Sequence, residues 1–188
     1  MEAILAGTKC IVGTVRSRAT CSPRPQTRAF PLPIPPRDHS TPRRPAGVIR
    51  ERKYVAHVRS DPPGTGPRGD PQSVARRVAV YGGEQVKHTG DGYMLAFTGP
   101  TRAVDCRQAI LRDAARGGLL LRCGLHTGEC ERWNRDLQGI TVHLAARIMA
   151  EGKPQTITTT QTVKDLLVGS STEFDALGTR DLRGIPGQ

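Results

Sequence analysis

Beyond residue 72, the apolar positions alternate between the period of strands and that of helices. Short runs rich in β-branched or aromatic residues, bounded by glycine or polar turns, indicate strands, and apolar residues three and four apart indicate helices. Strands are predicted at Gln85–His88, Tyr93–Phe97, Leu119–Glu129, Thr156–Thr160 and Phe174–Leu177. Helices are predicted at Gln72–Val80, Thr101–Arg116, Ile140–Ala150 and Thr162–Leu167. The alternation predicts an α+β fold, a mixed sheet with helices packed against it.

The first 72 residues have a different pattern. Twelve of the 15 prolines lie there, with only a weak strand signal at Tyr54–Val58. A chain with many prolines, high charge and few aromatic residues cannot bury enough apolar area to order itself. We therefore expect a disordered, basic, proline-rich segment over residues 1–72 and a folded domain over residues 73–188.

Charge separates the two parts further. Residues 1–72 hold 13 Lys and Arg against 5 Asp and Glu, so they carry +8 of the net charge of +11. A loose basic cluster could attract nucleic acid or an acidic membrane surface. Its members are Arg43, Arg44, Arg50, Arg52 and Lys53. No aromatic side chains alternate with them to stack on bases, so a solvated tail is favoured, with neither nucleic acid nor membrane as partner.

Cysteine use and hydropathy indicate a location. The five cysteines have no Cys-x-x-Cys spacing, which argues against a disulfide framework and against a zinc site. No uncharged apolar run is long enough to span a bilayer, and the first residues lack the features of a signal peptide. We expect a cytoplasmic protein.

A hairpin with a carboxylate at its tip is the first candidate for chemistry. Thr89-Gly90-Asp91-Gly92 separates two predicted strands as a tight turn, and Lys87 precedes it. Mg²⁺ binds one or two carboxylates and completes its shell with water and phosphate oxygens, so Asp91 could hold such a cation. Taken alone, an Asp such as Asp91 is more often part of an ordinary Asp-Gly turn, and a Lys such as Lys87 is more often a solvated strand residue.

A helix with two basic side chains is the second candidate. His143 and Arg147 lie four residues apart, so they share one face near a helix N-terminus, where a polyphosphate could bind. A partly buried helix with a polar stripe is the alternative. His126, in Leu125-His126-Thr127-Gly128-Glu129, is expected to be structural.

Taken in order, these pieces resemble one known family. Val86-Lys87-x-Thr-Gly-Asp-Gly, Gly-Leu-His-Thr-Gly-Glu, Gly-Ile-x-Val-His-x-x-Ala-Arg and the run from Leu182 to Gly187 are similar to the class III adenylate and guanylate cyclase catalytic domains, especially bacterial ones. The resemblance covers about 116 residues. It implies the ferredoxin-like α/β sandwich of those cyclases.

The resemblance also implies roles for residues. Asp91 matches a metal-binding aspartate, Lys87 and Asp136 match the pair that reads the purine and favours ATP over GTP, and Arg147 matches the arginine that stabilises charge on the α-phosphate. His143 stands where many members have a ribose-positioning Asn. The implied reaction converts ATP to 3′,5′-cyclic AMP and pyrophosphate with two Mg²⁺ or Mn²⁺ ions, at sites shared across a homodimer or a heterodimer with another cyclase chain.

The chain departs from the family at its first motif, Phe-x-Asp-Ile-x-Gly-Ser/Thr, whose Asp holds metal. Cys10 stands in that place in the faint match Cys10–Thr14, and a thiolate is a poor ligand for Mg²⁺. Pro62–Gly69 contains a formal Gly-x-Gly-x-x-Gly, but its prolines favour a linker over a nucleotide-binding loop. The family also usually continues into a closing strand beyond the position of Gln188, so the family domain is expected to be incomplete at both ends.

Three functions stay open at this stage. The first is a weak or impaired adenylate cyclase in which another carboxylate, such as Asp70 or Glu84, replaces the missing ligand. The second is a catalytically inactive regulatory or nucleotide-binding module. The third is a nucleic-acid binder that acts through its basic tail, which the composition favours least.

Overall fold

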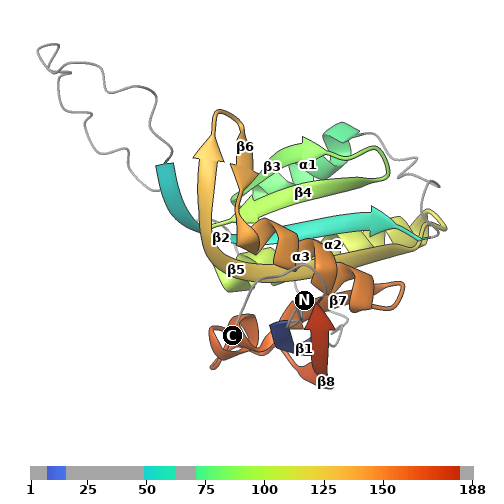
Figure 1. Ribbon diagram of the computed structural model, residues 1–188. Helices are drawn as coiled ribbons and strands as arrows, with labels where there is room; N and C mark the ends of the chain where they lie inside the picture. Colours follow the sequence, from blue (N-terminus) through green and yellow to red (C-terminus); the bar gives the residue numbers. More distant parts are fainter. Residues whose placement is uncertain (1–7, 16–48, 62–70, 183–188) are drawn as a thin grey trace, which may run out of the picture.

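One mixed sheet forms the centre of the protein in the computed structural model, which describes residues 8–15, 49–61 and 71–182. The described strands follow the order β3-β4-β2-β5-β7-β1-β8, with β6 paired to β5 (Figure 1). All pairs are antiparallel except β5 with β7. The strands are β1 (Thr8–Val15), β2 (Ile49–Ser60), β3 (Gly83–His88), β4 (Gly92–Phe97), β5 (Leu121–Trp133), β6 (Asp136–Gln138), β7 (Thr156–Thr160) and β8 (Phe174–Leu182).

Helices cover both faces of this sheet. They are α1 (Pro71–Val80), α2 (Pro100–Arg116), α3 (Ile140–Glu151) and α4 (Gln161–Asp165). Tyr54, Ala56 and Val58 on β2 enter the larger core, which α1, α2 and α4 complete. Val55, one residue out of phase, packs in a second core with Ala145 of α3. Figure 1 shows α3 crossing the face opposite α2. The predicted α+β fold is confirmed.

The expectation of disorder over residues 1–72 needs correction, since β1 and β2 both lie within that range. The weak signal at Tyr54–Val58 belongs to a strand of 12 residues that runs between β4 and β5. A central strand with both faces buried shows little alternation of apolar and polar residues, which is why its pattern was weak. The other residues of this range, 1–7, 16–48 and 62–70, lie outside the described part of the chain.

The predicted polar loop at Arg132–Asp136 also differs from the structure. β5 continues to Trp133, and β6 begins at Asp136 and pairs back onto β5. Asn134 has a positive φ of 54°, which suits a two-residue turn. This hairpin is mostly polar and exposed, so its strands carry no apolar pattern. The hairpin lifts Asp136 to the exposed face beside β3.

Candidate functional site

Lys87 and Asp136 lie in direct contact although 49 residues separate them in sequence. The Lys87 Nζ donates to both carboxylate oxygens of Asp136, at 2.9 and 2.8 Å. Their side chains are 43% and 38% exposed, so the pair faces solvent. The fold thus brings together a hydrogen-bond donor and an acceptor on an accessible surface.

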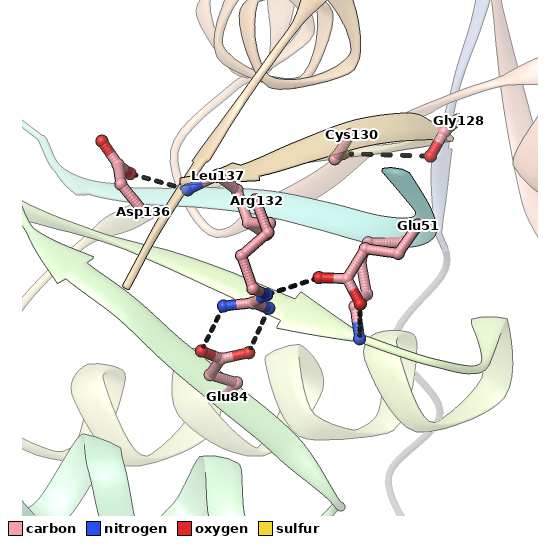
Figure 2. A network of polar contacts seen from close by, with 8 residues as sticks. Glu51, Glu84, Gly128, Cys130, Arg132, Asp136 and Leu137 are labelled. Carbon is pink, nitrogen blue, oxygen red and sulfur yellow. Dashed lines mark hydrogen bonds and ion pairs between the residues drawn. The ribbon is translucent and has the colours of Figure 1, made fainter. Parts of the chain in front are cut away.

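The Asp136 carboxylate is oriented by its own hairpin. The Leu137 N–H donates to Asp136 Oδ1 at 2.9 Å (Figure 2). Leu137 is itself 1% exposed and packs in the second core with Met94 and Ala145. The carboxylate therefore stands on a buried anchor and points outward.

Helix α3 presents His143 and Arg147, which are both exposed. Gly139 has a φ of 118°, a conformation that glycine adopts freely, and it turns the chain from β6 into α3. The Thr141 hydroxyl donates to the Glu129 carbonyl of β5 at 2.8 Å. The helix lies very close to β5, because a Cβ on Gly124 would come within 2.2 Å of the Ala145 carbonyl oxygen. This contact fixes the height of both basic residues above the sheet.

Asp91 occupies the tip of the β3–β4 hairpin, as the sequence predicted. The Arg59 Nε donates to Asp91 Oδ2 at 2.5 Å. The Asp91 side chain is 17% exposed and the Arg59 side chain 48%. A carboxylate that could hold a cation is thus neutralised by an arginine of β2.

Asp61 is a second carboxylate at the same end of the sheet as Asp91, and sequence reasoning missed it. The Ser60 N–H donates to the Asp91 carbonyl at 3.0 Å, so Asp61 follows directly after the contact between β2 and the hairpin. Arg122 Nη2 donates to both Asp61 oxygens, at 3.1 and 3.0 Å, and Arg122 Nη1 donates to the Gly152 carbonyl. The Asp61 side chain is 16% exposed.

A sequence signal for Asp61 exists in the run that was interpreted as a linker. Asp61-Pro62-Pro63-Gly64-Thr65 has the Asp-x-x-Gly-Ser/Thr spacing expected of the first motif, directly after a strand. The match with Cys10 is wrong, since β1 lies between β7 and β8 and β2, β5 and β7 separate it from β4. Of the earlier alternatives, Glu84 is bound to Arg132 at the end of β3 away from Asp91, and Asp70 lies outside the described residues.

These two aspartates fit a hard divalent cation by their chemistry. They are two mostly buried oxygen donors at one end of neighbouring strands, and Mg²⁺ needs only one or two carboxylates when phosphate and water complete its shell. Within the described ranges, no group of three or more His, Cys, Asp and Glu residues is placed to hold a metal. The fit therefore requires a ligand's phosphates, and a cation must compete with Arg59 and Arg122 for the carboxylates.

Two histidines near the site are held neutral. Burial lowers the pKa of His57 to about 4, and the charges of Arg107, Lys87 and His143 act in the same direction, against a hydrogen bond to the Val142 backbone. Burial likewise lowers the pKa of His126 to about 4, and its Nδ1 lies 2.9 Å from Thr160 Oγ1. His126 is thus a hydrogen-bonded structural residue, as expected from the sequence. His57 was not predicted, because nothing in the sequence places it beneath α3.

A family profile described as the adenylate and guanylate cyclase catalytic domain matches residues 72–188. A putative adenylate cyclase 3 of Rhizobium meliloti (strain 1021) is 26% identical over 117 residues, which is 57% of this chain and 20% of that protein. An uncharacterized protein of Mycobacterium tuberculosis (strain H37Rv) is 28% identical over 119 residues, 61% of this chain and 41% of that protein. The chain therefore spans between a fifth and two fifths of these relatives.

Solved structures agree on the fold. An adenylate/guanylate cyclase/hydrolase from Silicibacter pomeroyi superposes with a TM-score of 0.58 at 24% identity, over 73% of this chain and 94% of that one. Adenylate cyclases from Trypanosoma brucei, in their monomeric state, give 0.59 at 20% identity, over 79% and 89%. The catalytic core of a rhodopsin-guanylyl cyclase with converted specificity, in complex with ATPαS, gives 0.58 at 16% identity, over 71% and 100%.

In the described part of the chain, none of the helices is both long and apolar enough to cross a bilayer.

Proposed function

The chain belongs to the adenylate and guanylate cyclase catalytic domain family, and from this premise we propose that it is an adenylate cyclase domain that converts ATP to 3′,5′-cyclic AMP and pyrophosphate. The observation that carries the choice of ATP is the contact of Lys87 with Asp136 on the exposed face. A Lys can donate to a ring nitrogen of adenine, and an Asp can accept from its amino group. In the complex, Lys87 would bind the ring nitrogen instead of Asp136, and Asp136 would bind the amino group instead of Lys87.

The basic residues of α3 would act on the phosphates and the ribose. Arg147 is exposed four residues after His143, and a guanidinium can donate several hydrogen bonds to phosphate oxygens. It would stabilise the charge that builds on the α-phosphate, while His143 orients the ribose. A displacement at phosphorus depends mostly on such positioning and charge, because the protein forms no bond to the substrate.

The reaction is an internal displacement. The ribose 3′-oxygen attacks the α-phosphorus, the bond from that phosphorus to the bridging oxygen of the β-phosphate breaks, pyrophosphate leaves, and the hydroxyl proton passes to solvent. Mg²⁺ or Mn²⁺ held by Asp61 and Asp91 would lower the pKa of the 3′-hydroxyl and neutralise the leaving phosphates. Two carboxylates, and not one, are available for this role.

A site shared between two chains follows from the family, and we extend it to this protein. Asp61 and Asp91 would face Lys87, Asp136, His143 and Arg147 of a second copy, so that a homodimer has two equivalent sites. A heterodimer with another cyclase chain would have the same arrangement. The ion pair of Lys87 with Asp136 within one chain is consistent with both residues serving one purine.

A second candidate function is a nucleotide-binding module without turnover. It is favoured by the arginines on both candidate metal ligands, since Arg59 and Arg122 already neutralise Asp91 and Asp61. Such a module would bind ATP through Lys87 and Asp136 and regulate a complete cyclase.

Cyclic AMP formation by the purified chain with ATP and Mn²⁺ distinguishes the two candidates. We expect product from ATP, less from GTP, and loss of product in Arg147→Ala, a change on the exposed face of α3 that leaves the core intact. Arg180→Ala, an exposed arginine of β8 paired with Glu151, is the matched control and should keep activity. ATP binding without product in a folded dimer would contradict the enzyme and leave the regulatory module.

A further inference from the structure

Arg132 of β5 lies between carboxylates from two other strands (Figure 2). Its Nη1 and Nη2 donate to the two oxygens of Glu84 on β3, at 3.0 and 2.7 Å. Its Nε donates to Glu51 of β2 at 2.6 Å. The Arg132 side chain is only 19% exposed, and a two-pronged contact of this kind fixes direction as well as distance.

Arg132 lies close in the sheet to both Lys87 and Asp136, the two residues of the exposed ion pair. Arg132 stands opposite Leu137 in the β5–β6 hairpin, next to the step that pairs Trp133 with Asp136. Glu84 lies on β3, the strand that ends with Lys87 and His88. The contact of Arg132 with Glu84 therefore ties the β5–β6 hairpin, which carries Asp136, to β3, which carries Lys87.

This tie acts through side chains, because β3 pairs with β4 and β6 pairs with β5 in the sheet. Among the described residues, two polar side-chain contacts connect β3 with the hairpin: Lys87 to Asp136, and Arg132 to Glu84. A purine that enters between Lys87 and Asp136 must open the first contact. The second then holds the two strands at their spacing.

The charges around Arg132 balance one another. Lys53 Nζ lies 3.0 Å from Glu51 Oε2, so two cations and two anions form a chain from Lys53 through Glu51 and Arg132 to Glu84. The hydrogen bonds to Glu84 raise the pKa of Arg132, burial opposes them, and Glu51 adds to the increase. Three N–H groups of Arg132 therefore bind carboxylates within the chain, which also balance its charge.

We propose that Arg132 is a positioning residue that, through Glu84, sets the spacing of Lys87 and Asp136 and so determines which purine this chain accepts. The inference rests on the proposed function, because it assigns base selectivity to the same pair. Arg132 itself touches no nucleotide. Its effect is geometric, since a shift of a donor and an acceptor relative to one another changes which ring edge they match.

Nucleotide binding tests this without requiring turnover. A fluorescent ATP analogue is bound to the full chain with Mn²⁺ and displaced by unlabelled ATP or GTP, which gives a ratio of the two dissociation constants. Arg132→Gln should weaken ATP on the order of tenfold, as when an outer partner that orients a ligand is lost, and bring the ratio toward one. Arg50→Gln is the matched control. Arg50 and Glu131 also form an ion pair between β2 and β5, at 3.2 Å, but their side chains are 73% and 48% exposed.

A second set of variants separates positioning from folding. Arg132→Lys keeps one of the contacts and should restore part of the selectivity. Glu84→Gln should act like Arg132→Gln, and the double variant should be no worse than either single one, because both remove one shared contact. Melting temperatures are measured alongside to identify variants that are only less stable.

The outcomes are distinct. Variants that melt earlier but keep the wild-type preference for ATP would overturn the positioning role and leave the proposed function standing. A wild-type chain that binds neither nucleotide would overturn the proposed function and this inference together. Coupled loss of selectivity at residues 132 and 84, absent in Arg50→Gln, supports the inference.

Discussion

Two arginines neutralise the aspartates at the end of β2, and they do so with different strength. Arg122 contacts both oxygens of Asp61 and the Gly152 carbonyl, whereas Arg59 makes one contact to Asp91 and is half exposed. Because Arg59 is half exposed and makes a single contact, a divalent cation should displace it from Asp91 more easily than it displaces Arg122 from Asp61.

Arg59→Gln should therefore increase the affinity for Mn²⁺, by up to about fivefold, because the cation no longer competes with the guanidinium. Titration calorimetry with Mn²⁺ in the presence of a nonhydrolysable ATP analogue measures this. Arg50→Gln removes an even more exposed arginine from the other end of β2, far from Asp91, and should leave the affinity unchanged. Equal affinity in Arg59→Gln and the wild type would mean that Arg59 does not compete at the site.

The buried histidines predict how stability depends on pH. His57 and His126 ionise near pH 6.5 in an unfolded chain and near 4 in the folded one. Between these values the unfolded state binds protons that the folded state does not, so stability falls as the pH drops from about 6.5 toward 4. Urea unfolding at about pH 7 and about pH 5.5 should differ by about 1 kcal/mol for each histidine.

The histidine responsible can be identified by substitution. His126→Gln can keep the hydrogen bond to Thr160 but cannot be protonated, so it should lose about half of the pH dependence between these two conditions. His143→Gln changes an exposed side chain and serves as control. A wild-type chain of equal stability at both pH values would contradict the neutral state of these residues.

Among the elements, α3 depends most on small residues beneath it. A Cβ on Gly124 would meet the Ala145 oxygen at 2.2 Å and the Met149 nitrogen at 2.5 Å, both of which are backbone atoms that cannot turn away. The helix would have to move off β5, and His143 and Arg147 would move with it.

Gly124→Ala should thus destabilise the chain by about 1–3 kcal/mol and weaken nucleotide binding in the same variant. Gly99→Ala is the control, since nothing lies within 4 Å of its added Cβ and its φ of −141° suits any residue. Thermal melting and binding of the fluorescent nucleotide check both effects. Retained binding in a Gly124→Ala chain of normal stability would show that α3 is not held there as described.

The sequence predicted the elements that carry a helical period, a compact apolar or β-branched run, or bounding glycines, and underestimated those that carry none of these signals. α2 and α3 follow the helical period, and the hairpin around Asp91 is marked by its glycines. β2 was underestimated because exposed, charged residues precede its buried part, and the β5–β6 hairpin because most of its residues are polar. Neither condition leaves an alternating pattern.

The candidate site was likewise predicted only in part from the sequence. The helical spacing of His143 and Arg147 was visible in the sequence, and the turn at Asp91 was too. The contact of Lys87 with Asp136 depends on pairing across 49 residues, which only the resemblance suggested. Asp61 was missed because the prolines that follow it, Pro62 and Pro63, made the segment look like a linker and not like the family's first motif.

At the scale of the whole molecule, the candidate residues lie in two groups. Asp61 and Asp91 stand where β2 ends, and the Lys87–Asp136 pair lies on the face that α3 covers in part. If two copies share each site, one chain supplies the first group and its partner the second. Each group can then be removed without touching the other.

The measurement that tests this account most directly is cyclic AMP formation by Asp61→Asn and Arg147→Ala chains, each alone and then mixed. Each variant alone should make no product, because every site in its homodimer lacks one group. The mixture should recover about a quarter of wild-type activity, because half of the dimers are mixed and each of these has one intact site. A mixture that stays inactive beside an active wild type would contradict the shared site, and an Asp61→Asn chain with full activity would contradict the role of Asp61.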